Sequence, residues 1–426
     1  MVLRSASRTL AKLAPAIAIA AALLTPAQAQ KKLKVVGFYP DYSSGGISNT
    51  QASELSYTIY FSIKPPVDGN VSDEYIIGSI DAGRMLDMVE QGKKKGMGVI
   101  LCVGGAAESA NFPALAGNAS ASAKFASTLA AFCTANGIAG IDIDWEFPGG
   151  GGSYAFTQLS KALHTAFAPK GLLLSTNVNG PDNSQYTAEA LQQYDAVQIM
   201  SYDNDWPPGS SPHSTLSAAQ QHLGNYAAKI GSAYKSKLLL GVPFFGKGSG
   251  VEPKAYRDIL IGNPSLDPSA DNAGGYNFNG TNTLAQKTQY VIDQGYGGIM
   301  IWNLVQDAVD ARLLTSINTA IKGKGYVVDQ APVPINNRLA RTARDRFGIK
   351  PWDGEGRVRM HADHENVTLS LYSPDGRSLG LSNLTATDGA VALPKAAGRA
   401  LYRLEGASGV RVTGSAATMG QSGSGR

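Results

Sequence analysis

Three acidic side chains at alternate positions are the first candidates for chemistry in this sequence. The stretch GIDIDWEFPGG, residues 140–150, carries Asp142, Asp144 and Glu146 inside a run that otherwise has the composition of a buried strand. Successive side chains of a strand point to opposite faces, so the three carboxyl groups share one face and the intervening apolar residues share the other. Neighbouring carboxylates raise one another's pKa, and an acid that stays protonated near neutral pH is able to donate a proton. The stretch therefore predicts an acid–base site at the end of a buried strand.

The elements that position these acids are indicated by eight short apolar runs that alternate with helical segments. Residues 122–137 and 153–168, for example, repeat their apolar residues at helical spacing and end near Gly or Pro. The runs are VVGFY, TIYFSI, GVILCV, GIDIDW, LLLSTNV, AVQIMS, KLLLGVPFF and GGIMIWNL. Eight strands alternating with helices predict an α/β fold, the parallel (β/α)8 TIM barrel. An open doubly wound sheet is disfavoured because it needs fewer strands and the chain has no GxGxxG or Walker pattern.

In TIM barrels the reacting groups lie where the strands end, at the carboxyl face. Asp144 and Glu146 end the fourth run. Tyr202 and Asp203 follow the sixth run, and Trp302 ends the eighth. We therefore expect these side chains to converge on one site.

Composition divides the chain into five segments. The first has a cationic start, the apolar run LAPAIAIAAALL and a small-x-small site, which is typical of a signal peptide. A membrane anchor is disfavoured, because that run is shorter than the about 20 residues that span a bilayer, and no later segment is long enough. The expected organisation is a signal peptide at 1–29, a catalytic barrel at 30–324, a linker at 325–357, a small antiparallel β-sandwich-like domain at 358–410 and a disordered tail at 411–426.

Charge, cysteine and histidine usage narrow the possible partners. The formal net charge is +4, and three cationic residues lie within 1–29, so the remainder carries +4 − 3 = +1 and nucleic acid is not an expected partner. Cys102 and Cys133 are expected to be buried thiols without a disulfide. No metal or cofactor is predicted, and a monomer is the default. The histidines lack metal-ligand spacing and are expected at the surface; they are His164, His213, His222, His361 and His364.

Taken together, four motifs resemble the family 18 glycoside hydrolases, the chitinase family. The motifs are IDIDWE, MSYD, LLLGVPFFG and GGIMIW, and the likeness covers residues 33–323. Asp142, Asp144 and Glu146 match the last three acidic positions of the family's DxxDxDxE motif. The resemblance implies a TIM barrel and a retaining, substrate-assisted reaction, in which the acetamido group of the sugar is the nucleophile.

The resemblance also implies catalytic roles. Glu146 would protonate the glycosidic oxygen and later act as the base for water. Asp144 would orient the acetamido group, and Asp142 would share a proton with Asp144. Tyr202 would hydrogen-bond the acetamido carbonyl oxygen. A buried structural carboxylate is the alternative for Asp142, while a calcium site is disfavoured because alternate strand positions do not wrap an ion.

Substrate-binding residues are implied in the same way. Asp203 would contact the distorted sugar, and Met200 would line the pocket. Trp302 would form the apolar floor under the reacting ring, and Phe38 and Phe61, on the first and second strands, would complete that wall. Core packing is the alternative for these three aromatic side chains.

The sequence departs from the family pattern at several places. Ala139 stands where the strand-four motif begins with Asp, and Ala106 stands where an aromatic residue often follows the third strand. The second change predicts weaker binding on the leaving-group side. Residues 243–247 read PFFGK, without the usual Tyr and Arg. The segment 248–294 is short for the α+β insertion of many exo-acting members, which favours an open cleft and endo-type cleavage.

The expected function is that of a secreted, endo-acting chitinase. Its substrates would be chitin or chitooligosaccharides, cleaved at the β-1,4 bonds between N-acetylglucosamine units. The alternatives are an endo-β-N-acetylglucosaminidase acting on N-glycans and a catalytically inactive chitin-binding lectin; the intact Glu146 disfavours the lectin. The expected location is extracellular or periplasmic. Surface attachment, carbohydrate binding and stabilisation all remain open for the C-terminal domain.

Overall fold

The computed structural model describes residues 30–43, 46–149, 152–205 and 209–331, together with strands between residues 357 and 416. The expected signal peptide, most of the expected linker, and His361 and His364 lie outside the described residues.

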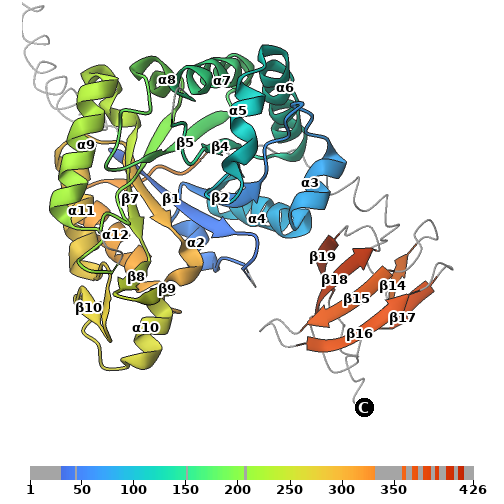
Figure 1. The fold of residues 1–426 in the computed structure, drawn as a ribbon. Helices are drawn as coiled ribbons and strands as arrows, with labels where there is room; N and C mark the ends of the chain where they lie inside the picture. The colour runs from blue at the N-terminus through green and yellow to red at the C-terminus, as the bar shows by residue number, and fades with distance from the viewer. Residues whose placement is uncertain are drawn as a thin grey trace, which may run out of the picture.

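The central feature is a closed barrel of eight parallel strands surrounded by helices (Figure 1). The sheet order is β12-β7-β6-β5-β4-β3-β2-β1, and β12 pairs with β1 in parallel to close the barrel. This architecture confirms the predicted TIM barrel. The barrel strands are β1 (Lys32–Pro40), β2 (Tyr57–Ile63), β3 (Gly98–Gly104), β4 (Gly140–Asp144), β5 (Leu173–Asn179), β6 (Ala196–Met200), β7 (Leu238–Pro243) and β12 (Gly298–Trp302).

Helices connect the strands, and polar caps and glycines set where several of them begin and end. One helix starts after Asp81, whose side chain accepts from the backbone N–H of Arg84, and ends at Gly96 with a φ of 77°. Another lies between the cap Asn118 and Gly137, which has a φ of 69°. The α-helices are α2 (Asn49–Ser53), α3 (Asp73–Ser79), α4 (Ala82–Lys95), α5 (Phe112–Ala116), α6 (Ala119–Asn136), α7 (Gly152–Phe167), α8 (Ala188–Gln192), α9 (Leu216–Ile230), α10 (Tyr256–Gly262), α11 (Thr281–Asp293) and α12 (Arg312–Gly323).

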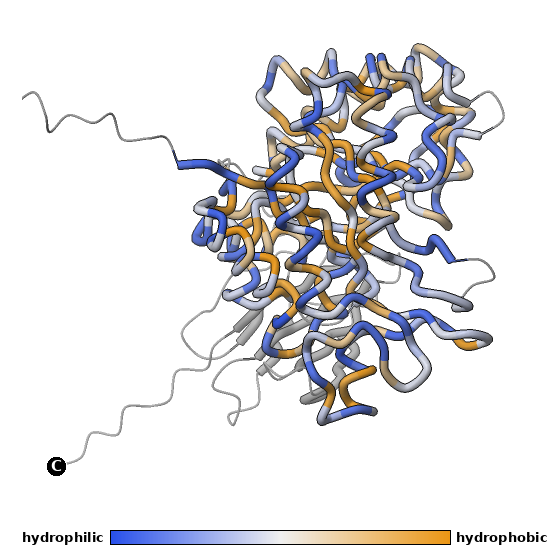
Figure 2. Tube along the Cα trace, turned by 90° about the vertical axis from the view of Figure 1, so that its left-hand side faces the viewer, coloured by the Kyte–Doolittle hydropathy of each residue, from blue (hydrophilic) through white to orange (hydrophobic). Residues whose placement is uncertain are grey.

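Alternation along the strands produces two hydrophobic clusters. The larger one lies between the strands and the helices and includes Ile141, Ile143 and Trp145; the Trp145 ring stacks on Phe112 with a centroid distance of 5.1 Å. The smaller one fills the barrel interior. Figure 2 shows the hydrophobic residues gathered along the strands and the hydrophilic residues toward the outside. The apolar residues of β4 therefore face the helices, which leaves its acids for the interior.

A compact α+β unit lies between β7 and α11. It contains an antiparallel sheet in the order β10-β11-β8-β9, with α10 following β9. Residues 248–294, which were expected to be too short for the α+β insertion of many exo-acting members, thus contain small strands in addition to the seventh barrel helix. These strands are β8 (Phe245–Gly248), β9 (Val251–Ala255), β10 (Asn272–Ala273) and β11 (Tyr276–Asn277).

After α12, the short strand β13 (Val327–Val328) pairs in parallel with residues 32–33 at the start of β1. The C-terminal strands are antiparallel: one sheet has the order β16-β15-β18-β19, and β14 pairs with β17. β19 consists of six residues within 411–426, the segment that was expected to be a disordered tail. These strands are β14 (Arg357–Met360), β15 (Val367–Tyr372), β16 (Ser378–Leu384), β17 (Gly389–Ala392), β18 (Ala400–Gly406) and β19 (Arg411–Ala416). Among the helices of the described part, none is long and apolar enough to cross a bilayer.

Candidate active site

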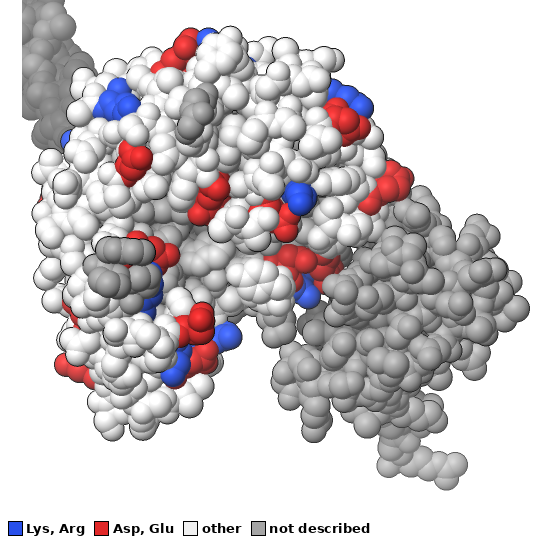
Figure 3. Space-filling view, viewed as in Figure 1, with Lys and Arg blue, Asp and Glu red and all other residues white. Residues whose placement is uncertain are grey.

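The carboxyl end of the barrel brings together side chains that are far apart in the sequence. Asp142 and Asp144 lie on β4, and Glu146 follows two residues after that strand ends. Tyr202 follows β6, and Trp302 is the last residue of β12. Figure 3 shows a hollow on the face of the molecule, with acidic side chains along its edge.

Asp142 is fully buried and accepts hydrogen bonds from four side chains. Its Oδ1 accepts from Ser175 Oγ at 2.6 Å and from Gln198 Nε2 at 2.8 Å. Its Oδ2 accepts from Asn177 Nδ2 at 2.6 Å and from Cys102 Sγ at 3.4 Å. Burial raises the pKa of Asp142 to about 6, although these donors oppose the rise. The group is therefore an anion at neutral pH, with its lone pairs occupied by donors.

Asp144 and Glu146 form a second acidic pair toward the cleft. Burial, then repulsion from Glu146 and Asp142, holds the pKa of Asp144 well above its usual range. Burial also raises the pKa of Glu146, while hydrogen bonds from Asp144 and from the backbone of Ala106 lower it. The raised pKa of Asp144 favours its protonated form, which is able to donate a hydrogen bond to Glu146.

The hydrogen bonds of Asp142 bear on its expected sharing of a proton with Asp144. About four lone-pair sites are available on a carboxylate, and the four donors to Asp142 occupy them. Hydrogen bonding between the Asp144 and Glu146 side chains is among the causes of the pKa shifts of these two groups. One oxygen of Asp144, Oδ1, is buried without a hydrogen-bond partner among the described residues.

Two glycines at the end of β3 allow the backbone to support Glu146. The N–H of Glu146 donates to Ser109 Oγ at 2.9 Å, and that hydroxyl donates to the carbonyl oxygen of Gly105 at 2.8 Å. Gly104 and Gly105 have φ values of 105° and 109°, which L side chains rarely adopt. A Cβ on Gly105 would lie 2.4 Å from the ring of Phe61. Both positions therefore require glycine.

The aromatic residues expected to form the sugar platform pack as one cluster. The Trp302 ring lies 5.3 Å from Phe38 and 5.0 Å from Phe61, measured between centroids. Phe38 is only 1% exposed, so it supports Trp302 from below and does not face the cleft. Half-buried Met200 packs against the interior cluster, which also contains Tyr202.

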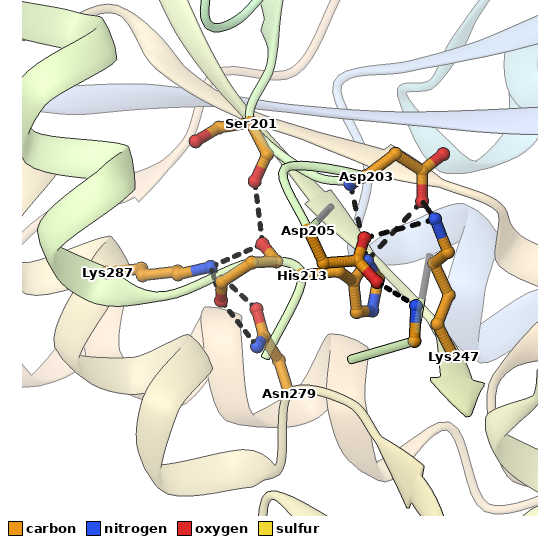
Figure 4. Close-up of polar contacts among 9 residues, drawn as sticks. Ser201, Asp203, Asp205, His213, Lys247, Asn279 and Lys287 are labelled. Carbon is orange, nitrogen blue, oxygen red and sulfur yellow. Dashed lines mark hydrogen bonds and ion pairs between the residues drawn. The ribbon is translucent and has the colours of Figure 1, made fainter. Parts of the chain in front are cut away.

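Asp203 lies among charged groups at the rim. Its backbone is left-handed, with a φ of 59°, and its side chain is half exposed. Its Oδ1 lies 3.3 Å from Lys247 Nζ and 3.5 Å from His213 Nδ1, and Lys247 is also 3.1 Å from Asp205 Oδ1 (Figure 4). Burial raises the pKa of Asp203, but His213 and Lys247 outweigh it and the net pKa is lowered. Asp203 is therefore an anion in the working pH range.

The expectation of surface histidines is wrong for two of them. His213 is 1% exposed and His222 is 5% exposed. The imidazole of His222 hydrogen-bonds Ser201 Oγ through Nδ1 at 2.9 Å. Both histidines hydrogen-bond the segment after β6 through Nδ1, whereas Nε2 of His213 is buried without a hydrogen-bond partner among the described residues.

Sequence reasoning also missed the donors around Asp142, although a signal for them exists. Ser175 and Asn177 occupy alternate positions of an apolar strand, and Gln198 is a single polar residue in another. Such positions share the inward face with the acids. Lys247, in contrast, lies in the PFFGK stretch, and nothing in its spacing indicated a contact with Asp203. Among the described residues, no group of three or more His, Cys, Asp or Glu side chains is arranged to hold a metal ion.

Comparisons with known proteins agree with this geometry. The family model described as "Glycosyl hydrolases family 18" matches residues 34–307. An endochitinase from Brugia malayi is 24% identical over 297 residues, which are 54% of this chain and 59% of that protein. The chain thus spans about three fifths of this relative's length.

Solved structures share the fold at low sequence identity. A chitinase from Bacteroides thetaiotaomicron matches with a TM-score of 0.61 and 21% identity, over 70% of this chain and 99% of that chain. A chitinase-like agglutinin from Robinia pseudoacacia matches with a TM-score of 0.58 and 22% identity, over 67% of this chain and 98% of that chain.

Proposed function

This chain belongs to the glycosyl hydrolases of family 18, and we propose that it cleaves β-1,4 bonds between N-acetylglucosamine units of chitin or chitooligosaccharides. The observation that carries the proposal is the pairing of buried Asp144 with half-buried Glu146, whose pKa values are both raised, beside Asp144 Oδ1, which has no hydrogen-bond partner among the described residues. Such a pair suits a reaction that needs a proton donor and an acceptor for an amide N–H.

In the first step, Glu146 donates a proton to the glycosidic oxygen. The bond between the anomeric carbon and that oxygen breaks, and its electron pair stays on the leaving sugar. The acetamido carbonyl oxygen of the same substrate forms the new bond to the anomeric carbon, giving an oxazolinium ion. The proton that Asp144 shares with Glu146 is available to supply this step.

Asp144 binds and stabilises the acetamido group. Its unpartnered Oδ1 would accept the acetamido N–H, which acquires positive charge as the ring closes. The hydroxyl of Tyr202 would donate to the acetamido oxygen and hold it toward the anomeric carbon. The ionised Asp142 keeps the pKa of Asp144 high.

In the second step, Glu146 acts as a base. It removes a proton from water, whose oxygen attacks the anomeric carbon and opens the oxazolinium ring, so that the configuration is retained. Trp302 would provide the apolar floor for the sugar ring, supported by Phe38 and Phe61, while Met200 lines the pocket. Asp203 would contact a hydroxyl of the same sugar.

Two further functions remain as alternatives. An endo-β-N-acetylglucosaminidase on N-glycans would use the same residues, because its substrate also has an acetamido group beside the cleaved bond. A binding protein without activity is the other, since one structural neighbour is a chitinase-like agglutinin. The intact acid pair favours an enzyme.

The decisive experiment is mass spectrometry of the products formed from N-acetylglucosamine hexamer. We expect dimers, trimers and tetramers from the wild-type protein and a loss of at least about 100-fold in rate for Glu146→Gln. Glu108→Gln is the matched control, because Glu108 follows the neighbouring strand β3 and pairs with Lys64 at 3.9 Å. An uncleaved hexamer with cleaved high-mannose glycoprotein would support the N-glycan alternative, and binding without cleavage of either would support the lectin.

Endo-type cleavage and export are part of the same proposal. Mixed products at the earliest time points would support endo-type cleavage, whereas dimer alone would contradict it. Export would be tested by the N-terminal sequence of the protein recovered outside the cytoplasm, with Gln30 as the expected first residue.

A further inference from the structure

The amino group of Lys287 on α11 is completely buried and makes three hydrogen bonds to neutral groups. Its Nζ donates to the carbonyl oxygen and to the Oγ of Ser214, both at 2.8 Å, and to Asn279 Oδ1 at 2.6 Å. An ammonium group has three N–H donors, so this set satisfies it. A buried charge without a carboxylate partner is costly, and the pKa of Lys287 is lowered to about 7 by burial. The fold therefore holds the Lys287 amino group in one defined position despite the unfavourable free energy of its desolvation.

The partner of this cation is a dipeptide that runs along the segment after β6. We call His213–Ser214 the clip. Ser214 Oγ donates to the carbonyl oxygen of Ser201 at 2.7 Å, and the carbonyl oxygen of His213 accepts from the N–H of Asn204 at 3.1 Å. His213 Nδ1 accepts from the N–H of Asp203 at 3.3 Å. Three bonds of the clip thus bracket Tyr202 and Asp203.

Lys287 and Asn279 anchor the clip from the opposite side, as Figure 4 shows. The Nδ2 of Asn279 also donates to the carbonyl oxygen of Ser214, at 2.8 Å. The cation is 0% exposed and Asn279 is 4% exposed, so no solvent substitutes for these bonds. Neither residue reaches the acids on β4 through a bond of this network. Hydrogen bonds therefore connect α11 through the clip to the backbone of Ser201, Asp203 and Asn204, the segment that contains Tyr202.

We infer that Lys287 is a positioning residue for the reaction, acting through the clip to hold Tyr202 and Asp203 against the bound sugar. The inference rests on the proposed function, because it assigns Lys287 to the same site. His222 also supports this segment, because its imidazole hydrogen-bonds the side chain of Ser201. Among the described lysines and arginines, only Lys287 donates to Ser214.

The test compares Lys287→Met with wild type, using hydrolysis of 4-methylumbelliferyl diacetylchitobioside. Met keeps the length of the side chain and removes all three donors. We expect kcat/KM to fall by about 10- to 100-fold, because a displacement near 1 Å is enough for such a loss. In a Tyr202→Phe, Asp203→Asn background the same change should cost no more than about threefold, because its effect passes through those residues.

Two pairs of variants separate positioning from general loosening. Ser214→Ala should reproduce part of the loss in kcat/KM. Ser214→Thr keeps the hydroxyl and should therefore retain kcat/KM close to the wild-type value. Thr288→Val is the matched control: Thr288 is also buried on α11, but its hydroxyl bonds Leu284 within the helix and does not touch the clip. A Lys287→Met enzyme with wild-type kcat/KM per folded molecule would overturn the inference, as would an equal loss in both backgrounds.

Amide hydrogen exchange provides a readout that does not need activity. Exchange at residues 201–204 should accelerate at least about tenfold in Lys287→Met, while exchange at residues 140–146 stays unchanged. If wild-type protein cleaves no N-acetylglucosamine substrate, the proposed function fails, and unchanged exchange at 201–204 would then overturn the positioning role as well. Active wild type with an unaffected variant overturns the inference alone.

Discussion

Asp142 would influence the proposed reaction through the pKa of its neighbour Asp144. Four donors satisfy the carboxylate of Asp142. Burial and repulsion from Glu146 raise the pKa of Asp144 most, and the charge of Asp142 adds to them, which favours the protonated form of Asp144. The arrangement separates the two tasks of a carboxylate: one group remains an anion, and the other remains an acid.

A pH profile of Asp142→Asn tests this account. Activity should fall on the alkaline side as the Asp144–Glu146 pair is deprotonated, and the charge of Asp142, after burial and Glu146, contributes to the raised pKa of Asp144. Without that charge the pKa of Asp144 falls, so the alkaline limb of kcat/KM should move to lower pH. We also expect a loss of about tenfold or more at the optimum. An alkaline limb that stays at the wild-type pH would contradict the assignment.

The site was only partly predictable at this scale. The three acids, Tyr202 and Trp302 share a face or a strand end, which alternation and strand order reveal. The donors to Asp142 come from β3, β5 and β6, so their common target depends on barrel closure. His213 and Lys247 reach Asp203 through loop conformation, which local patterns do not specify.

Among the elements, α12 has a carboxylate at its N-terminus that sequence patterns also missed. Asp307 is buried, and its oxygens accept from the backbone N–H groups of Leu313 and Leu314 at 3.1 and 3.0 Å. It also accepts from the N–H of Ala308 at 2.7 Å. These N–H groups have no partner within the helix, so the carboxylate satisfies them.

Asp307→Ala should therefore lower the free energy of unfolding by about 1–2 kcal/mol, the range seen when a helix cap is removed. Thermal or urea unfolding would measure the loss. Asp293→Ala is the control, because Asp293 is exposed and pairs with exposed Lys324 at 2.8 Å, and it should change stability by less than about 0.5 kcal/mol. Equal effects of the two substitutions would argue against a capping role.

The turn after β3 offers a second test at the level of an element. Ala106 is exposed there, and its backbone contacts the Glu146 side chain. A tryptophan at this position would add an aromatic face on the leaving-group side, so Ala106→Trp should tighten binding of N-acetylglucosamine hexamer by about 1 kcal/mol, or fivefold. Calorimetry in the Glu146→Gln background measures this affinity without turnover. Unchanged affinity would indicate that the sugar does not pass over this turn.

The strands and most barrel helices followed from hydrophobic periodicity, whereas the unit after β7 did not. β10 and β11 have two residues each, too few for alternation to be visible. Their pairing depends on contacts with β8 and not on their own composition.

For the whole molecule, closure of the barrel makes residues 30–331 a candidate for independent folding. β1 pairs with β2 on one side and β12 on the other, and the helices bury one continuous core against these strands. The described strands after residue 357 belong to separate sheets and do not pair with the barrel sheet.

A chain ending after Ala331 should therefore unfold cooperatively and cleave the soluble hexamer at a rate within about twofold of the full chain. Parallel assays on insoluble chitin would show whether the C-terminal strands assist binding to the polymer. Loss of hexamer cleavage by the shortened chain, with the full chain active, would show that the barrel needs those strands.

The pairing of β13 with the first residues of β1 has a practical consequence for immobilisation. It brings the chain after α12 back to the beginning of β1, at the end of the barrel opposite the acids. A tether fused near either residue 30 or residue 331 would therefore leave the cleft pointing away from its support. Protein anchored to a bead in this way should keep the proposed active site accessible to long polymers.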